Sequence, residues 1–287
     1  MPQVCIVNDA AQSQMSSASQ AFFLATEWAI ANSSAVAFDC EGVNLSRVGS
    51  LELVSLCFEH DSSKVYLVDK GGSCDITFRQ LRLQALKRLF ESKHVMKIIH
   101  DCRMDSDALW HHFGIKLERV HDTSCWHFAV SGRWKAGLNE TLEKNGLPTN
   151  AIRDSSIYKR NPKFWATRPL TAQMTTWASG DVDKLLALAC NQVRSLQALG
   201  PTHTNNATKE SEHYAAMVRD MKVVKDIHCR ISIGAFFGTK GCNLRSLERC
   251  TGAVVHSYSE TPFGQTKFMI FYPNEQALAA VRRAMGY

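Results

Sequence analysis

The most informative stretch of the sequence is "AVAFDCEGV", residues 35–43. An apolar run ends there in two acids, Asp39 and Glu41, that are separated by one residue. Because side chains on a strand alternate between its faces, both carboxylates would leave the same side of a sheet. Two like charges side by side repel each other unless a cation lies between them. The stretch is therefore either half of a metal site or only the polar end of an edge strand.

The chain has 287 residues, a formal net charge of +6 and 45% hydrophobic residues. These values fit one large or two ordinary globular domains and exclude a disordered chain. The start lacks signal-peptide and transit-peptide patterns, and no apolar run is long enough for a membrane helix. Ten cysteines without a CxxC pair are typical of reduced thiols, so we expect a cytoplasmic or nuclear protein without membrane association. The charge tolerates a nucleic-acid partner but does not establish one.

The first 200 residues alternate between strand and helix patterns. Strands are expected at 35–41, 51–60, 64–69 and 96–101, and helices at 78–92, 104–113, 123–132, 137–145 and 171–198. Consecutive strands followed by strand–helix alternation predict an α/β fold, with a mixed sheet and helices on its faces.

The polar segment "GPTHTNNATKESE", residues 200–212, has no hydrophobic period and is interpreted as a linker or loop. It separates a domain at 1–199 from a smaller one at 213–287. A helix-like stretch at the start of the second domain precedes a compact α+β pattern. Its expected elements are a helix at 211–224, a strand at 228–234, a helix at 238–252, strands at 253–259 and 266–273, and a helix at 275–286.

Further acids lie on the predicted helices. Asp105 falls one helical turn before Leu109, so it lies on or beside the inward face. Its neighbour Asp101 looks more like a helix cap, and Asp107 points elsewhere on the helix.

Asp181 shares a helix face with Trp177, four residues earlier, and has no obvious Lys or Arg on its inner face. A single aspartate on such a helix is usually a solvated residue or a cap. Four acids at the ends or inner faces of core elements, Asp39, Glu41, Asp105 and Asp181, are harder to dismiss together. Clustered carboxylates without basic partners favour a hard divalent cation, Mg²⁺ or Mn²⁺.

The sequence here resembles a known family. "FDCEG", "HDCRMDS", "VHDT" (120–123) and "RPLT" are similar to the motifs of the DEDD (DnaQ-like) 3′–5′ exonucleases, in the RNase D-like branch that includes the Egalitarian-type proteins. The resemblance covers residues 3–198 and implies an RNase H-like (DnaQ-like) fold.

The resemblance also implies hydrolysis of phosphodiesters with two metal ions. Asp39 would bridge both ions, Glu41 and Asp181 would complete the site of the ion that activates water, and Asp105 would help to hold the second ion. The product would be a nucleoside 5′-monophosphate released from a 3′ end.

One position departs from the family pattern. The family orients the attacking water with a Tyr four residues before the last Asp, or with a His five residues before it. This sequence has Trp177 and Thr176 at those positions. Because an indole N–H can only donate a hydrogen bond, we expect reduced rather than absent hydrolysis. A non-catalytic RNA-binding adaptor that reuses the fold stays an alternative.

The C-terminal module resembles a KH domain of the eukaryotic type, with the order βααββα. A GxxG motif is followed by Leu244 and Leu247 at helical spacing. Glycines let the backbone approach phosphates, and the following helix start offers N–H groups. Arg249, like Arg245, lies either along the nucleic-acid groove or on a solvated helix face, whereas Phe236 and Phe237 are expected in the core. The candidate nucleic-acid-binding residues are Gly238, Thr239, Lys240, Gly241 and Arg245.

Together the two modules predict a Mg²⁺- or Mn²⁺-dependent 3′–5′ exoribonuclease whose KH domain captures single-stranded RNA. RNA is favoured over DNA by the family resemblance alone, so a 3′–5′ DNA exonuclease is a further alternative. The sequence indicates no particular protein partner.

Overall fold

The computed structural model describes residues 2–8, 15–71, 76–134 and 136–287. The chain forms two compact units. Unit 1 comprises Met1–Arg153 and Trp165–Ala216, and unit 2 comprises Asp154–Phe164 and Met217–Tyr287.

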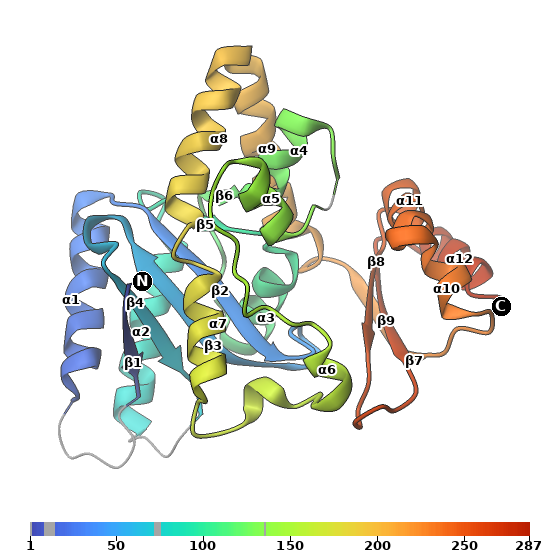
Figure 1. Cartoon of the computed structure of the whole chain (residues 1–287), viewed down its shortest axis with the longest axis horizontal. Helices are drawn as coiled ribbons and strands as arrows, with labels where there is room; N and C mark the ends of the chain where they lie inside the picture. The colour runs from blue at the N-terminus through green and yellow to red at the C-terminus, as the bar shows by residue number, and fades with distance from the viewer. Residues whose placement is uncertain (1, 9–14, 72–75, 135) are drawn as a thin grey trace. The chain divides into compact units, whose positions relative to one another are not determined.

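Unit 1 is built on a six-stranded mixed sheet, which confirms the predicted fold class (Figure 1). The strand order is β1-β4-β3-β2-β5-β6; β3 is antiparallel to β2 and β4, and the other neighbours are parallel. The strands are β1 (Gln3–Val7), β2 (Val36–Val43), β3 (Ser50–Phe58), β4 (Lys64–Asp69), β5 (Lys97–Ile99) and β6 (Val120–Asp122). The sequence reading missed the short strands β1 and β6.

Helices cover both faces of this sheet (Figure 1). Residues of α1, α2 and α3 share a hydrophobic core with one face, whereas α7 contacts β3 and β4 and α8 contacts β2 and β5. The α-helices of unit 1 are α1 (Ser17–Asn32), α2 (Ile76–Glu91), α3 (Arg103–Phe113), α4 (Thr123–Ser131), α5 (Leu138–Lys144), α7 (Ala172–Gly180), α8 (Leu185–Leu199) and α9 (Pro201–Met217). Short 3₁₀ turns occupy Glu59–Asp61 and Phe164–Ala166.

The alternation of β2 separates its core residues from its acids. Val36, Phe38 and Cys40 belong to the core shared with α1, α2 and α3. Asp39 and Glu41 therefore leave the opposite face, where α7 and α8 pack. The strand parity inferred from the sequence is confirmed.

The predicted helix at 171–198 is wrong in one respect, because the chain forms two helices there. Helix α7 ends at Gly180, Asp181 is its C-terminal cap, and α8 begins at Leu185. The break turns Asp181 toward the sheet instead of leaving it within a continuous helix.

The predicted linker at 200–212 is also wrong, because residues 201–212 lie within α9 (Pro201–Met217). Proline fits the first turn of a helix, and the small residues Ala207, Ser211 and Ala215 are buried at four-residue spacing. The Ser211 hydroxyl accepts a hydrogen bond from the Asp122 N–H at 3.1 Å. Small residues give a weak hydrophobic signal, so the sequence alone predicts a loop where this face packs. The boundary between the two units falls after Ala216.

Unit 2 has the predicted order βααββα, with three antiparallel strands in the order β7-β9-β8. The first strand was predicted wrongly at 228–234, where Ser232 instead accepts a hydrogen bond from the Ala235 N–H and starts a helix. The helix expected at 211–224 ends at Met217. The elements are β7 (Lys222–Ile227), α10 (Ile233–Phe237), a 3₁₀ turn (Thr239–Gly241), α11 (Cys242–Thr251), β8 (Val254–Tyr258), β9 (Lys267–Tyr272) and α12 (Glu275–Ala284), with α6 (Ile157–Arg160) in the inserted segment.

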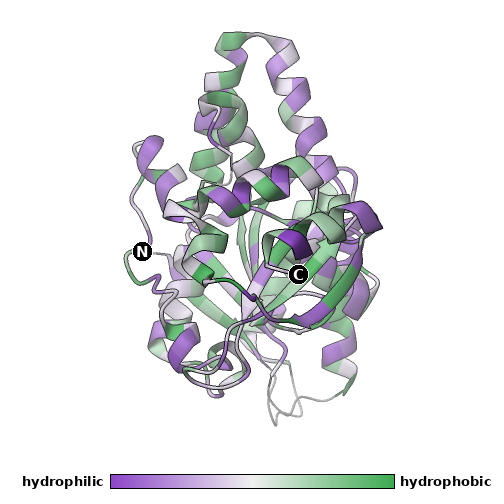
Figure 2. Cartoon of the chain, turned by 90° about the vertical axis from the view of Figure 1, so that its right-hand side faces the viewer, coloured by the Kyte–Doolittle hydropathy of each residue, from purple (hydrophilic) through white to green (hydrophobic). Residues whose placement is uncertain are grey.

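Hydrophilic and hydrophobic residues alternate along the helices in Figure 2, as amphipathic helices require. In the described part of the chain, every helix is too short or too polar to cross a membrane.

Candidate active site

Three of the four predicted acids come together on one face of the sheet. Ligand oxygens of Asp39, Glu41 and Asp181 lie within 4.8 Å of one another, and we call these residues the acidic trio. Asp39 and Glu41 come from β2, and Asp181 comes from the end of α7. A register shift between β2 and β3 follows Glu41 directly. At Gly42 a Cβ atom would lie 1.9 Å from the Ser50 carbonyl oxygen, so only glycine allows this close approach.

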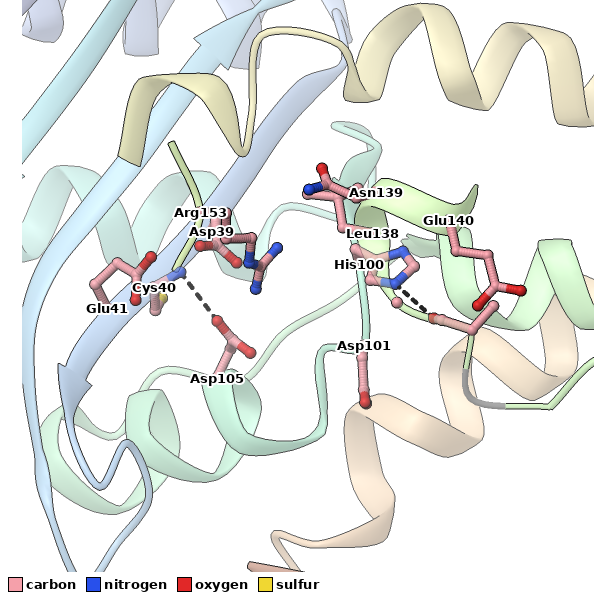
Figure 3. A pocket seen from close by; sticks show the side chains of 12 residues that line it. Asp39, Cys40, Glu41, His100, Asp101, Asp105, Leu138, Asn139, Glu140 and Arg153 are labelled. Carbon is pink, nitrogen blue, oxygen red and sulfur yellow. Dashed lines mark hydrogen bonds between the residues drawn. The ribbon is translucent and has the colours of Figure 1, made fainter. Parts of the chain in front are cut away.

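The fourth acid, Asp105, lies in the first turn of α3 and joins that helix to β2. The Cys40 N–H donates a hydrogen bond to Asp105 Oδ1 at 3.0 Å (Figure 3). Asp105 is buried and lines the same pocket as Asp39 and Glu41. The inward orientation predicted for this acid is confirmed.

A pocket of about 590 Å³ opens beside these acids (Figure 3). His100 lines the pocket, with Nδ1 2.9 Å from Thr123 Oγ1 and Nε2 3.0 Å from the Ala136 carbonyl oxygen. The described residues that line the pocket are Asp39, Cys40, Glu41, His100, Asp101, Asp105, Ala136, Gly137, Leu138, Asn139, Glu140 and Arg153.

Burial and the charges of neighbouring acids raise the pKa values of the four carboxyl groups. Desolvation raises the pKa of Asp39 well above its usual value, and the charges of Asp105 and Asp181 raise it further. The pKa of Glu41 is likewise raised well above its usual value, by burial first and then by Asp39. Burial raises the pKa of Asp105 to about 7 and also raises that of Asp181. Ionising this group of acids is costly until a cation neutralises it.

The chemistry of these donors fits divalent metal ions. All of them are carboxylate oxygens, which are the ligands that Mg²⁺ and Mn²⁺ prefer, and the acidic trio is close enough for one ion. Burial raises the pKa values of Asp39 and Glu41, and the charges of neighbouring carboxylates raise them further. A bound cation would favour the charged forms.

Two polar side chains that hold Asp181 were missed in the sequence. Asn150 Nδ2 donates to Asp181 Oδ1 at 2.8 Å and to the Trp177 carbonyl at 2.9 Å. Arg153 Nη1 lies 3.4 Å from the same Asp181 oxygen. The expectation that the acids have no basic partner is therefore wrong, because Arg153 reaches them from a loop with no helical spacing to Asp181.

Trp177 holds Asp181 from the other side. Its indole Nε1–H donates to Asp181 Oδ2 at 2.9 Å, and its ring meets Trp165 edge-on at 5.7 Å between centroids. The side chain is buried, and it is not among the described residues that line the pocket. The indole donor is thus directed at the Asp181 carboxylate.

The motif "RPLT" holds the start of α7. Arg168 Nε donates to Asp69 Oδ1 at 2.8 Å, and Arg168 Nη2 donates to the Glu52 carbonyl at 3.1 Å. Thr171 caps the helix by accepting the Met174 N–H at 3.2 Å. These contacts tie the N-terminus of α7 to the sheet. They therefore also help to fix the position of Asp181 at the other end of the helix.

The motif "VHDT" acts through Asp122, which is fully buried. Its carboxylate accepts hydrogen bonds from the N–H groups of Asp101 at 3.0 Å and of Cys102 at 2.7 Å. Asp101 has a φ of +62°, which is strained for a residue with a side chain. Asp122 stabilises this turn and so orients the start of α3, where Asp105 lies.

Two further acids, one just before α3 and one within it, are ion-paired. The expectation that Asp101 caps α3 is wrong, because Asp101 Oδ1 pairs with Arg103 Nε at 2.6 Å and the capping position belongs to Cys102. Asp107 does point elsewhere, toward Arg47, with 2.6 Å between Oδ1 and Nη2.

Gly180 makes room for Asn150. A Cβ atom at position 180 would lie 2.8 Å from Cγ and Nδ2 of Asn150. We therefore expect Gly180→Ala to displace Asn150 from Asp181 and to lower the free energy of unfolding by about 2 kcal/mol, the value of a buried hydrogen bond to a charged group. Denaturant unfolding measures this loss. The matched control is Gly234→Ala, an exposed helix position with no atom within 4 Å of the added methyl group. Equal stability of the two variants would contradict the role given to Gly180.

The GxxG segment of unit 2 forms the turn between α10 and α11. Gly238 and Gly241 have φ values of +70° and +76°, which favour glycine. Thr239 and Lys240 are exposed at the tip of the turn. Arg245 Nη1 donates to the Lys240 carbonyl at 2.6 Å, so this side chain braces the turn.

Two phenylalanines and one arginine near the GxxG turn were singled out in the sequence. Phe236 is buried in the core of unit 2, and Phe237 packs against that core, which confirms the prediction for both rings. Arg249 is exposed on α11. The KH assignment itself stays a prediction.

Comparisons with known proteins agree with this geometry. A family model described as 3′–5′ exonuclease matches residues 18–195. The piRNA biogenesis protein EXD1 of Mus musculus is 28% identical over 172 residues, which cover 55% of this chain and 29% of that protein. The EXD1 protein of Xenopus laevis is 32% identical over 170 residues, which cover 55% of this chain and 37% of that protein. The chain thus spans about a third of the length of these curated relatives.

Solved structures share the fold. Trypanosoma brucei RNase D superposes with a TM-score of 0.59 at 20% identity, covering 86% of this chain and 80% of that one. Escherichia coli RNase D superposes with a TM-score of 0.56 at 21% identity, covering 77% and 52%.

Proposed function

The chain belongs to the 3′–5′ exonuclease family, and we propose that it hydrolyses single-stranded RNA from the 3′ end with two bound Mg²⁺ or Mn²⁺ ions. The observation that carries this proposal is the convergence of the acidic trio within 4.8 Å, beside Asp105 and an open pocket. Asp39, Glu41, Asp181 and Asp105 would hold the ions. Bound there, the ions would supply Lewis-acid chemistry that stabilises negative charge on a phosphodiester.

The protein's own groups prepare the site for this reaction. Asn150 and Trp177 donate hydrogen bonds to separate oxygens of Asp181, so the carboxylate is fixed in orientation before any ion arrives. The Cys40 N–H does the same for Asp105. Such preorganisation lowers the cost of assembling the site at the moment of reaction.

RNA is the proposed substrate on two grounds. The curated relatives are named for piRNA biogenesis, and the motifs resemble the RNase D-like branch. A pair of oligonucleotides of one sequence, RNA and DNA, each with a free or a blocked 3′ end, tests both the sugar and the direction. We expect shortening of the RNA with a free 3′-hydroxyl, and equal shortening of DNA would redirect the proposal to a DNA exonuclease.

Unit 2 is proposed to bind the RNA as a KH domain. Its element order, its sheet order and the glycine turn with exposed Thr239 and Lys240 support this reading. The backbone at Gly238 and Gly241 can approach phosphates without a side chain in the way. Loss of RNA affinity in a variant with Lys240→Asp would support this role.

A second candidate, an RNA-binding adaptor with little hydrolysis, is favoured by Trp177 and Arg153. Both donate toward Asp181, and neither can act as an acceptor for a water molecule. Detection of RNA binding by a wild-type chain that releases no nucleotide with any divalent ion would select this candidate.

Position 177 tests how the attacking water is oriented. We expect Trp177→Tyr to raise the rate of nucleotide release by about tenfold, since a positioned hydroxyl group can accept as well as donate. Trp177→Phe removes the donor to Asp181 and is the matched control, with a lower rate than the wild type. Single-turnover rates on one RNA measure both changes. A Tyr variant no faster than the Phe variant would contradict the water-orienting role.

A further inference from the structure

Arg153 places a positive charge inside the acidic pocket. Its Nη1 atom lies 3.4 Å from Asp181 Oδ1, and its side chain lies beside Asp39 in Figure 3. The side chain is 41% exposed, so it borders the open space of the pocket as well as the acids. Among the described residues that line this pocket, no other is a Lys or an Arg.

The charge of Arg153 acts on every member of the acidic trio. Its Nη1 atom is 3.4 Å from Asp181 Oδ1, and the ligand oxygens of the acidic trio lie within 4.8 Å of one another, so the positive charge is close to all three carboxylates. One guanidinium therefore serves three carboxylates that cannot all be ionised cheaply without a cation. A divalent ion would neutralise the same carboxylates with twice the positive charge of the guanidinium.

We propose that Arg153 is a resident counter-ion that competes with divalent cations for the acidic trio and pairs with a phosphate of the nucleic acid once cations are bound. The first half concerns the free protein, and only the second half rests on the proposed function. Two divalent ions neutralise four carboxylates, so the guanidinium is then left with surplus positive charge beside an open pocket. A guanidinium matches a phosphate with two parallel hydrogen bonds, which makes the phosphate its natural next partner.

The first half is tested by metal affinity without nucleic acid. Electron paramagnetic resonance titration with Mn²⁺ gives the dissociation constant for the wild type, for Arg153→Gln and for Arg88→Gln. Arg88 is an exposed arginine that pairs with Glu27 and does not line the pocket. Its variant changes the net charge of the protein by the same amount as Arg153→Gln but leaves the pocket intact. We expect the Kd for Mn²⁺ to fall about fivefold in Arg153→Gln and to stay at the wild-type value in Arg88→Gln.

The Mn²⁺ dissociation constants test the proposal whether or not the protein is an active nuclease. Equal or weaker Mn²⁺ binding by Arg153→Gln, in a variant whose circular dichroism matches the wild type, refutes the competition. Absence of Mn²⁺ binding in both proteins refutes it too. If Arg153→Gln fails to fold, Arg153→Lys, which keeps the positive charge, is used instead. The expected Kd for Mn²⁺ is then that of the wild type, and tighter Mn²⁺ binding would refute the competition.

The second half is tested by RNA binding in Ca²⁺, using fluorescence anisotropy of a short labelled single-stranded RNA. We expect the RNA Kd to rise about tenfold in Arg153→Gln and by less in Arg153→Lys, because a lysine keeps the charge but loses the paired donors. Unchanged RNA affinity in Arg153→Gln, with tighter Mn²⁺ binding, would overturn the phosphate contact while leaving the competition intact. Neither readout requires hydrolysis, so a failure of the proposed nuclease activity is recognised separately.

Discussion

Asp39→Asn is expected to lower the rate of nucleotide release by about a thousandfold or more. Asp39 lies in the acidic trio and lines the same pocket as Asp105, so it would be one of the residues that hold the metal ions. An amide of the same shape removes one negative charge and halves the number of oxygen ligands. Because burial already raises the pKa of Asp39, the neutral amide also costs the free protein little stability. Release of nucleotide from labelled RNA in Mn²⁺ measures the rate.

Asp183→Asn is the matched control. Asp183 is two residues from Asp181, yet it pairs with Lys184 at 2.6 Å and lies outside both the acidic trio and the described pocket lining. We expect its rate to stay within about twofold of the wild type, because its carboxylate pairs with Lys184 and is not part of the acidic trio. Similar losses in both variants would mean that general charge, and not the trio, determines activity.

Stability without metal is expected to fall as pH rises, because of Asp105. Its pKa is raised by burial to about 7 in the folded protein, compared with about 3.9 for an unfolded aspartate. The folded state then holds a proton that the unfolded state has already lost. The stabilisation is complete below about pH 4 and is lost as pH rises through about 7, with a full difference of about 4 kcal/mol.

The clean readout is the difference between the wild type and Asp105→Asn in a chelator. Burial lowers the pKa of His121 to about 4, which changes stability in the opposite direction below about pH 6.5 but does so equally in both proteins. We expect the melting temperature of Asp105→Asn to exceed that of the wild type increasingly between pH 5 and 8, by about 10 °C at the upper end.

Divalent metal should reverse this order. Mn²⁺ binds the ionised carboxylates of the folded protein and stabilises it by mass action, so the wild type gains more at pH 8 than Asp105→Asn does. A difference between the two proteins that is independent of pH would contradict the placement of Asp105 in a crowded acidic site.

The sequence was sufficient for strands β2, β3, β4 and β5 and for the inward-facing acids, because both follow local rules of spacing. Alternation within "AVAFDCEGV" separates Phe38 and Cys40 from Asp39 and Glu41, and the strand has that parity in the structure. Asp105 lies one turn from Leu109, and this helical spacing predicted its inward direction. Patterns with a fixed period carry such information in a single sequence.

Features that depend on long-range packing were not accessible in this way. Asn150 and Arg153 reach Asp181 from an irregular loop, so no spacing links them to it. Helix α9 is buried through small residues, whose weak hydrophobicity resembles that of a linker. The role of Asp122 depends on a strained turn at Asp101, which becomes visible only when two strand ends lie side by side.

The most direct measurement is a time course with single-stranded RNA that carries a 5′ label and a free 3′-hydroxyl, incubated with the full chain and Mn²⁺. The account predicts a ladder of labelled products that shorten from the 3′ end, absent with Asp39→Asn and present with Asp183→Asn. Full-length RNA that persists with the wild type in both Mn²⁺ and Mg²⁺ would contradict the proposed nuclease, as would a ladder of equal intensity with Asp39→Asn.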